Sequence, residues 1–281
     1  MSIDHKQQDG RVAIVTGAWG GIGEATALAL VRAGYRVFGT GRKPPQSKSA
    51  GVEFLICDVT SDVSVEAAFS EVVAKAGRID LLVNNAGAGL MGGAEESSIE
   101  QAKSLFDVNL FGVMRTTRAI LPVMRRQKRG RIVNISSVMG LIPAPYMAVY
   151  ASSKHALEGY SESLDHELRT RGIRVSVIEP AYTKTPFDAN LLEPDAKLDE
   201  YREIRAAVTR RVKEVMATAD QPGVVAEVVL KAANAAHPKP RYTAGGLASR
   251  LRLLRRFAPA SMVDAGIRKD LRLDVSVAGT S

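Results

Sequence analysis

The 281-residue sequence contains very little cysteine and no long hydrophobic run. Its one cysteine, Cys57, excludes a disulfide within the chain, which is typical of proteins kept in a reducing compartment. No stretch of about 18 consecutive apolar residues is present, so the sequence predicts no transmembrane helix. The polar N-terminus, MSIDHKQQDG, lacks the apolar core of a secretory leader. We therefore expect a cytoplasmic protein.

Acidic residues are scarce in the C-terminal part of the chain. The formal net charge is +8, and residues 237–272 hold nine basic but only two acidic side chains, while the remainder is close to neutral. This segment lacks the interleaved aromatic residues of a nucleic-acid binder, so we expect no nucleic-acid partner. Hydrophobic residues make up 46% of the sequence, which allows a sizeable core and excludes a disordered chain. The basic residues are Lys239, Arg241, Arg250, Arg252, Arg255, Arg256, Arg268, Lys269 and Arg272.

Apolar runs of strand length alternate with amphipathic segments along the chain. The expected strands are 11–17, 35–41, 52–59, 79–87, 131–137 and 173–180, with 241–245 as a candidate seventh. The expected helices are 22–34, 62–77, 98–127, 147–171 and 221–236. Such alternation requires right-handed crossovers and predicts an α/β fold: a doubly wound, parallel Rossmann-type sheet with helices on both faces.

The same alternation of strands and helices predicts a single catalytic domain. It covers residues 8–245, includes a substrate loop at 181–220, and is followed by a basic amphipathic C-terminal extension, 246–281. We expect irregular structure in 181–215 and in the extension. Pro122 is expected to bend its helix or to mark an irregular turn.

A glycine-rich turn, TGAWGGIG at 16–23, joins the first strand to the first helix. Gly17, Gly21 and Gly23 would allow a tight turn and a close approach of backbone to a pyrophosphate, which the helix N-terminus would bind through free N–H groups. Glycines are also ordinary turn residues, but their position between strand and helix favours dinucleotide binding.

The end of the second strand lacks the acidic residue that would bind an adenosine ribose diol. The sequence there is GTGRK, with Arg42 and Lys43. Because a guanidinium suits a 2′-phosphate, this pattern favours NADP over NAD. The alternative is a pair of solvated loop cations. Asp58, after the third strand, would accept from the adenine amino group or would simply cap a turn.

The stretch AVYASSK places Tyr150 and Lys154 four positions apart, on one face of the expected helix. A cation at that distance would favour phenolate over phenol and lower the pKa of the tyrosine. Taken alone, the pair is equally compatible with a chance arrangement on an amphipathic helix.

Five motifs together resemble the classical short-chain dehydrogenase/reductase family over residues 10–245. The order and spacing of all five agree, and the RYTAGG motif with the basic, leucine-rich tail resembles the 17β-hydroxysteroid- and retinol-dehydrogenase-like subgroup. The motifs are TGAWGGIG, NNAG at 84–87, Asn109 within DVNLFG, NISS at 134–137 and YASSK at 150–154.

The resemblance implies an NAD(P)-dependent enzyme acting on CH–OH groups (EC 1.1.1.-). Tyr150 would be the general acid for reduction and base for oxidation, and Lys154 would tune it and bind the nicotinamide ribose. Ser137, thirteen residues before the tyrosine, would donate to the substrate oxygen; Ser136 is the competing candidate, and strand alternation should turn only one of them toward the site. Asn109, at a local helix irregularity, would bind a water that links to the lysine.

The resemblance also implies a set of cofactor-binding residues. Ala181 departs from the family's proline–glycine, and we expect it to be tolerated. Trp19 would cover the cofactor or shield the turn. Asn84 is expected to tie neighbouring strands together. The cofactor-binding residues are Gly17, Trp19, Gly21, Ile22, Gly23, Arg42, Asp58, Val59, Asn85, Ala86, Gly87, Tyr150, Lys154, Pro180, Thr183 and Thr185.

The substrate and partners are less strongly indicated. An apolar lining predicts a lipophilic ketone or alcohol, and it is formed by Met91, Met139, Leu141, Ile142, Pro143 and Tyr146. Helices 98–127 and 147–171 are the expected interface of a homodimer or homotetramer. The amphipathic segment 245–259 would lie on a membrane surface, cover the substrate pocket, or pack on its own subunit or a partner.

Two other function classes stay open. A catalytically silent NADP-binding regulator would share the fold, and a sugar-nucleotide epimerase would add a larger C-terminal domain. His155 and His166 have no acid or cysteine at metal spacing, so we expect no metal site.

Overall fold

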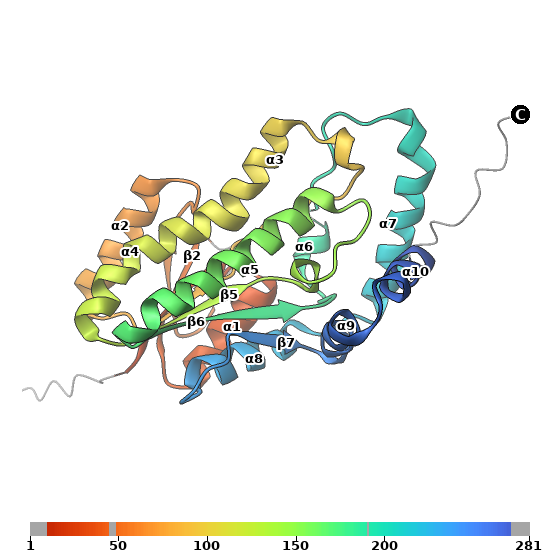
Figure 1. Cartoon of the computed structure of the whole chain (residues 1–281). Coiled ribbons are helices and arrows are strands. Elements are labelled where there is room, and N and C mark those ends of the chain that lie inside the picture. Colours follow the sequence, from red (N-terminus) through yellow and green to blue (C-terminus); the bar gives the residue numbers. More distant parts are fainter. Residues whose placement is uncertain (1–9, 45–48, 190, 271–281) are drawn as a thin grey trace, which may run out of the picture.

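A sheet of seven parallel strands, in the order β3-β2-β1-β4-β5-β6-β7, forms the centre of the described structure (Figure 1). This computed structural model describes residues 10–44, 49–189 and 191–270. Most of the polar N-terminus, Arg272 and the end of the predicted basic extension lie outside the described residues. The strands are β1 (Val12–Thr16), β2 (Arg36–Gly41), β3 (Val52–Ile56), β4 (Leu81–Asn84), β5 (Gly130–Ile135), β6 (Ile173–Pro180) and β7 (Arg241–Ala244).

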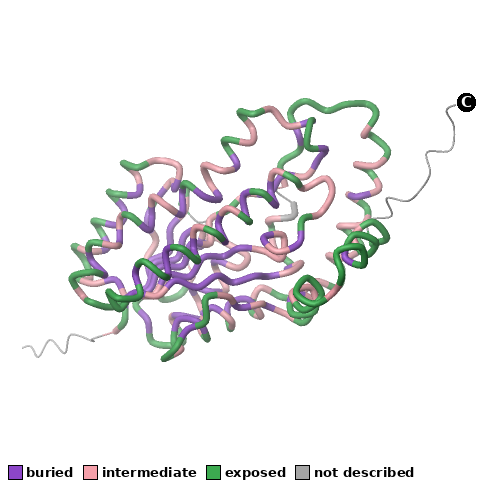
Figure 2. The backbone as a smooth tube through the Cα atoms, in the orientation of Figure 1, coloured by how far each residue is buried: buried purple, intermediate pink, exposed green. Residues whose placement is uncertain are grey.

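Both faces of the sheet are covered by helices, so its strands are buried on two sides (Figures 1 and 2). This explains why the strand sequences are continuous apolar runs and do not alternate between apolar and polar residues. The helices are α1 (Gly21–Arg32), α2 (Asp62–Ala76), α3 (Ile99–Phe106), α4 (Gly112–Gln127), α5 (Ala148–Leu168), α6 (Pro186–Ala189), α7 (Arg202–Ala217), α8 (Pro222–Asn234), α9 (Gly246–Phe257) and α10 (Ala260–Asp270).

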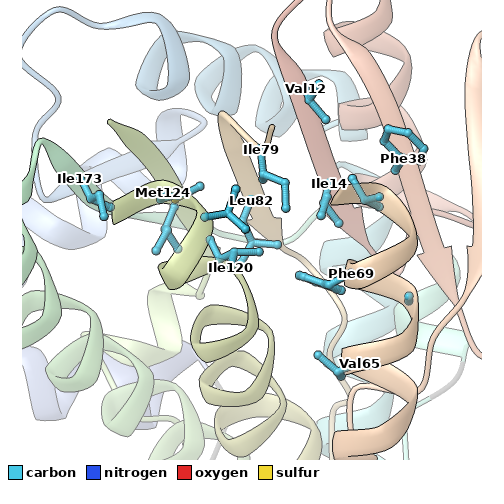
Figure 3. Close-up of a cluster of buried hydrophobic side chains, with 14 of the residues drawn as sticks. Val12, Ile14, Phe38, Val65, Phe69, Ile79, Leu82, Ile120, Met124 and Ile173 are labelled. Atoms are coloured by element: carbon cyan, nitrogen blue, oxygen red, sulfur yellow. The ribbon is translucent and has the colours of Figure 1, made fainter. Parts of the chain in front are cut away.

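The alternation of side chains along β1 builds two separate hydrophobic clusters. Ile14 points to the face covered by α2, α4 and α5, where it joins Phe69, Ile120 and Met124 (Figure 3). Val15, its neighbour, points to the face covered by α1 and α8. Because successive residues of a strand face opposite sides, a single apolar run supplies both layers of the core.

The expected sheet and the single domain are confirmed, and the structure corrects two details of the helices. Residues 181–215 are not irregular throughout, since α7 begins within them, and the extension forms α9 and α10. Pro122 lies inside α4. The irregularity of this helical stretch lies instead in η2 (Asp107–Phe111), a π-helical turn between α3 and α4.

Buried polar side chains tie the central strands to the helices above them. The amide of Asn84 donates to Asn134 Oδ1 at 2.9 Å, across the β4–β5 pair. Asn134 Nδ2 in turn donates to Ser161 Oγ on α5 at 2.8 Å, and Thr116 Oγ1 on α4 donates to Asn84 Oδ1 at 2.7 Å. This confirms the structural role expected for Asn84 and fixes two helices to the sheet.

We predict that Asn84→Ala destabilises the fold by about 1–3 kcal/mol, because the substitution leaves the buried side-chain oxygen of Asn134 without the amide group that donates to it. Denaturant unfolding measures this change. Ser152→Ala, on the exposed face of α5, is the control and should change the free energy of unfolding by less than about 0.5 kcal/mol. Equal effects of the two substitutions would contradict the proposed tie.

Candidate active site

A cavity of about 1340 Å³ lies at the carboxyl ends of the parallel strands. It is lined by Gly17 after β1, Arg42 after β2, Asn85 after β4, Ser137 after β5 and Pro180 at the end of β6. The order of strands reverses between β1 and β4, and the crevice at such a switch point is where open α/β sheets bind ligands.

Most of the predicted site residues meet in this one cavity. Two do not line it: Gly23 and Asn109 lie behind its wall. Both Ser136 and Ser137 reach the cavity, so strand alternation does not separate them as expected, although Ser136 is buried and Ser137 half-exposed. The predicted residues that line the cavity are Gly17, Trp19, Gly21, Ile22, Arg42, Asp58, Val59, Asn85, Ala86, Gly87, Ser137, Tyr150, Lys154, Pro180, Thr183 and Thr185.

The glycine turn needs its glycines for steric reasons. Gly17 and Gly21 have φ values of 64° and 55°, in the left-handed region. A Cβ on Gly23 would collide with the carbonyl oxygen of Gly17. Asn85 Nδ2 donates to the carbonyl oxygens of Thr16 and Gly17 at 3.0 Å, so it braces the turn. The first N–H groups of α1, which lack partners within the helix, therefore begin at the cavity wall and suit an anion.

Trp19 covers the end of β2 beside the glycine turn. Its Nε1 donates to the carbonyl oxygen of Lys43, its ring meets that of Phe54 edge-on at 4.4 Å, and it leaves no room for a side chain on Gly41. The indole therefore shields the glycine turn and also forms part of the cavity wall. Arg42 lines the cavity, whereas Lys43 does not.

Asp58 is both a turn cap and a cavity residue. Its Oδ1 accepts from the backbone N–H of Thr60 at 2.9 Å and from the Thr60 hydroxyl at 2.7 Å. These bonds to the charged form, led by the backbone N–H, lower the pKa of Asp58. The carboxylate is thus ionised at the cavity edge.

The Tyr150–Lys154 pair lies inside the cavity. Lys154 Nζ donates to the carbonyl oxygen of Ile135 at 3.0 Å and lies 5.7 Å from the centre of the Tyr150 ring. Burial lowers the pKa of Lys154 to about 8, and the negative charge of Glu158 opposes that shift. A buried ammonium is therefore held one helical turn from a buried phenol.

Asn109 braces the loop that follows β4 instead of lining the cavity. In η2, its side chain accepts from Ala88 N at 2.8 Å and donates to Ala88 O at 2.9 Å and to Ser153 Oγ at 3.0 Å. Both amide hydrogens of the side chain therefore have protein acceptors, and its oxygen has one protein donor. The backbone irregularity expected at this position is present.

The outer part of the cavity is apolar. Of the residues expected to line it, Met91, Met139, Ile142 and Pro143 do so. Leu141 and Tyr146 do not, and the prediction for these two is wrong. Tyr146 has a left-handed backbone, with φ of 64°, and its ring lies against that of Tyr201, 6.2 Å between centres.

The C-terminal extension completes this apolar wall. Leu247, Leu251 and Leu254 of α9 line the cavity, which agrees with one of the three alternatives for this segment. Helices α7 and α10 were not predicted from the sequence. The residues missed there are Val212 and Val215 on α7, and Val263 and Ile267 on α10.

Two buried glutamates lie beneath the site. Glu158, on the same helix as Lys154, pairs with Arg241 Nε at 2.8 Å. Glu179, fully buried, has no hydrogen-bond partner within the described chain and only longer ion pairs, 3.6 Å to Arg241 and 3.9 Å to Arg252. Burial, reinforced by the charge of Glu158, raises the pKa of Glu179 to about 7, against the opposing arginines.

Within the described residues, no group of three or more histidine, cysteine, aspartate or glutamate side chains is arranged to hold a metal ion. In the same ranges, none of the helices has both the length and the apolar character needed to cross a membrane.

Known proteins resemble the chain over most of its length. The family described as short chain dehydrogenase matches residues 11–196. A Bacteroides thetaiotaomicron protein named 3-ketodihydrosphingosine reductase is 39% identical over 180 residues, which are 64% of this chain and 66% of that protein. Retinol dehydrogenase 8 of Bos taurus is 34% identical over 255 residues, 82% of this chain and 80% of that protein.

Solved structures share the fold. A short-chain dehydrogenase from Streptomyces avermitilis has a TM-score of 0.79 at 29% identity, with 94% of this chain and 97% of that chain covered. Relatives from Burkholderia phymatum, with NAD, and Burkholderia cenocepacia, with NADP, have TM-scores of 0.76 and 0.74 at 26% identity. They cover 89% and 93% of this chain, and 94% and 98% of their own.

The doubly wound sheet, with a glycine turn at its first crossover, is that of a nucleotide-binding protein. With these matches, the chain belongs to the classical short-chain dehydrogenase/reductase family, whose members act on CH–OH groups.

We predict that Glu179→Gln flattens the pH dependence of stability. In the folded protein the pKa of Glu179 is about 7, above the 4.5 of a free glutamate, so the unfolded chain releases this proton first as pH rises. The wild type therefore loses stability from about pH 4.5 through about pH 7, by on the order of 3 kcal/mol, and the variant lacks this loss.

Unfolding free energies across this pH range, compared between variant and wild type, measure the effect. The matched control is Glu162→Gln, which removes the exposed carboxylate that also pairs with Arg241. A difference between Glu179→Gln and wild type that stays constant with pH would refute the raised pKa.

Proposed function

We propose that this chain is an NADP-dependent reductase of lipophilic ketones, or the dehydrogenase of the corresponding secondary alcohols. The observation that carries the proposal is the meeting, in one cavity, of the glycine turn, Arg42 and the buried Tyr150–Lys154 pair. A binding site for an anionic dinucleotide thus adjoins a group that can give or take a proton.

Tyr150 handles the proton. A buried ammonium beside the phenol favours phenolate over phenol, which makes the hydroxyl a better donor to a developing alkoxide. Ser137 is the second donor to the substrate oxygen; its Oγ already accepts from Met139 N at 3.1 Å, so its own proton stays available. Asn109 supports this arrangement by fixing η2 against α5.

The part of the cavity beside the glycine turn has the residues to bind a dinucleotide. The N-terminus of α1 and the glycine turn would hold the pyrophosphate, and Asp58 with Val59 would flank the adenine. Thr183 and Thr185 would orient the nicotinamide. Ala181 does not have the positive φ that would demand glycine, which supports the expected tolerance at this position. When bound, the nicotinamide supplies or accepts the hydride.

The preference for NADP rests on Arg42. The chain has no acidic residue directly after β2, and the guanidinium is the cation that reaches the cavity there. An arginine binds a 2′-phosphate by bidentate, charge-assisted hydrogen bonds. The apolar wall from α7, α9 and α10 supports a lipophilic substrate. Homo-oligomerisation through α3–α4 and α5 stays a prediction.

We predict that Tyr150→Phe lowers the rate of ketone reduction by about 10²- to 10⁴-fold, because the general acid is lost while the ring and its packing remain. Loss of NADPH absorbance over a panel of steroid, retinoid, long-chain and aromatic ketones measures the rate, and NADPH binding by fluorescence should be unchanged.

The control for this variant is Tyr160→Phe, on the same helix but outside the cavity. Full activity of Tyr150→Phe on a ketone that the wild type reduces would refute the assigned acid. A wild type that binds NADPH and reduces no ketone of the panel would instead point to the silent regulator.

We predict that Arg42→Ala weakens NADPH binding by about 10- to 100-fold and leaves NADH binding unchanged, because only the 2′-phosphate loses charge-assisted hydrogen bonds. Fluorescence titration with each cofactor measures both affinities. Lys43→Ala is the matched control, since Lys43 lies outside the cavity wall. Equal losses of affinity for NADPH and NADH would show that Arg42 does not bind the 2′-phosphate.

A further inference from the structure

Helix α9 presents apolar side chains in two directions. Leu247 and Leu251 line the cavity, whereas Leu253 and Phe257 are 58% and 72% exposed. Residues four apart share a helix face, so the last two form one outward ridge, rotated by roughly 100° from the cavity side. In Figure 2 most of α9 and α10 is coloured as exposed.

Cations flank the outward ridge. Arg250 and Arg256, three residues before and three residues after Leu253 on α9, are exposed, and no acidic residue of the described chain forms an ion pair with them. The Arg256 guanidinium lies over the Phe257 ring, 5.3 Å from its centre. Helix α9 carries no acidic residue at all. Apolar and positive groups are thus interleaved on one surface.

The inward side of α9 is held in place, so the outward side stays presented. Ala248 is fully buried, and Arg252 points back to pair with Glu179 at 3.9 Å. On α10, Asp270 accepts from Arg211 of α7 at 2.6 Å. Met262, at the start of α10, is a further exposed apolar side chain, with 58% of its surface accessible.

We propose that this α9–α10 surface docks on an anionic lipid bilayer. A helix whose exposed side combines leucine and phenylalanine with arginines matches a membrane interface, where apolar side chains enter the acyl boundary and cations meet lipid phosphates. A nucleic acid would use the arginines but leave Leu253 and Phe257 in water. A second copy of this chain would bring the same positive charge against itself.

Docking would bring the bilayer to the outer wall of the substrate cavity. The same helices that meet the lipid contribute Leu251, Val263 and Ile267 to the inner lining. A lipophilic substrate dissolved in the membrane would then have a short path to the site. This consequence rests on the proposed function, but the docking itself does not.

Flotation of the full-length protein with vesicles, without substrate or NADPH, tests the proposal. We expect binding to phosphatidylcholine–phosphatidylglycerol vesicles, weaker binding to phosphatidylcholine alone, and weakening by salt. The double variant Leu253→Ser/Phe257→Ser should lose about tenfold or more of its affinity, and so should Arg250→Gln/Arg256→Gln. Reductase turnover, measured separately, shows whether the proposed function fails independently.

Two control variants carry the same chemical changes elsewhere. Val63→Ser/Ile99→Ser removes exposed apolar residues of α2 and α3, and Arg125→Gln/Arg126→Gln removes exposed cations of α4. Both should bind vesicles like the wild type. The proposal is overturned by absence of binding to anionic vesicles or by equal losses in α9 variants and controls. It is also overturned by lipid-free self-association that depends on Leu253 and Phe257, which would make the surface an interface between copies.

Discussion

The buried ammonium of Lys154 is the constraint on which the site depends. A charged amine removed from water is costly unless partners surround it. Here the carbonyl oxygen of Ile135 accepts directly, and the carboxylate of Glu158 lies one turn further along α5. The pKa of the lysine nevertheless falls to about 8, which shows that burial outweighs these partners. The position of the phenol beside it is useful only if this charge is held in place.

The polar ladder through the middle of the molecule provides that fixation. Asn84 joins β4 to β5, and Asn134 joins β5 to Ser161 on α5. Ile135, the acceptor for Lys154, is the residue that follows Asn134. Strand β5 therefore holds α5 through the side chain of Asn134 and accepts the Lys154 ammonium through the backbone carbonyl of the next residue, Ile135. Displacement of α5 along the sheet would break both interactions together.

The sheet was predictable because its strands are buried on both faces, and such strands appear in the sequence as unbroken runs of apolar residues. Residues 79–87 were expected to form a strand that runs into a loop, and the structure places this change at Asn84, where β4 ends and the chain turns into the cavity loop. Helix α7 was missed because only Val208 of its residues is buried, so its sequence is dominated by polar side chains. Gly17, whose position is set by a backbone turn, lines the cavity, as the position of the glycine motif between strand and helix led us to expect. The orientation of Tyr146 depends on tertiary contacts and could not be read from the sequence.

The glutamate cluster explains how the extension is coupled to the active-site helix. Arg241 lies between Glu158 on α5 and Glu179 on β6, and Arg252 reaches Glu179 from α9. Two charged carboxylates in this small buried space would repel each other, whereas a protonated Glu179 leaves Glu158 and Arg241 as a balanced pair. Glu158 also stabilises the charge on Lys154. The protonation state of Glu179 therefore affects both the ion pair that holds α9 and the pKa of the lysine. Helix α9, which lines the cavity, is thereby linked through three side chains to Lys154, the group that tunes the Tyr150 phenol in the proposed function.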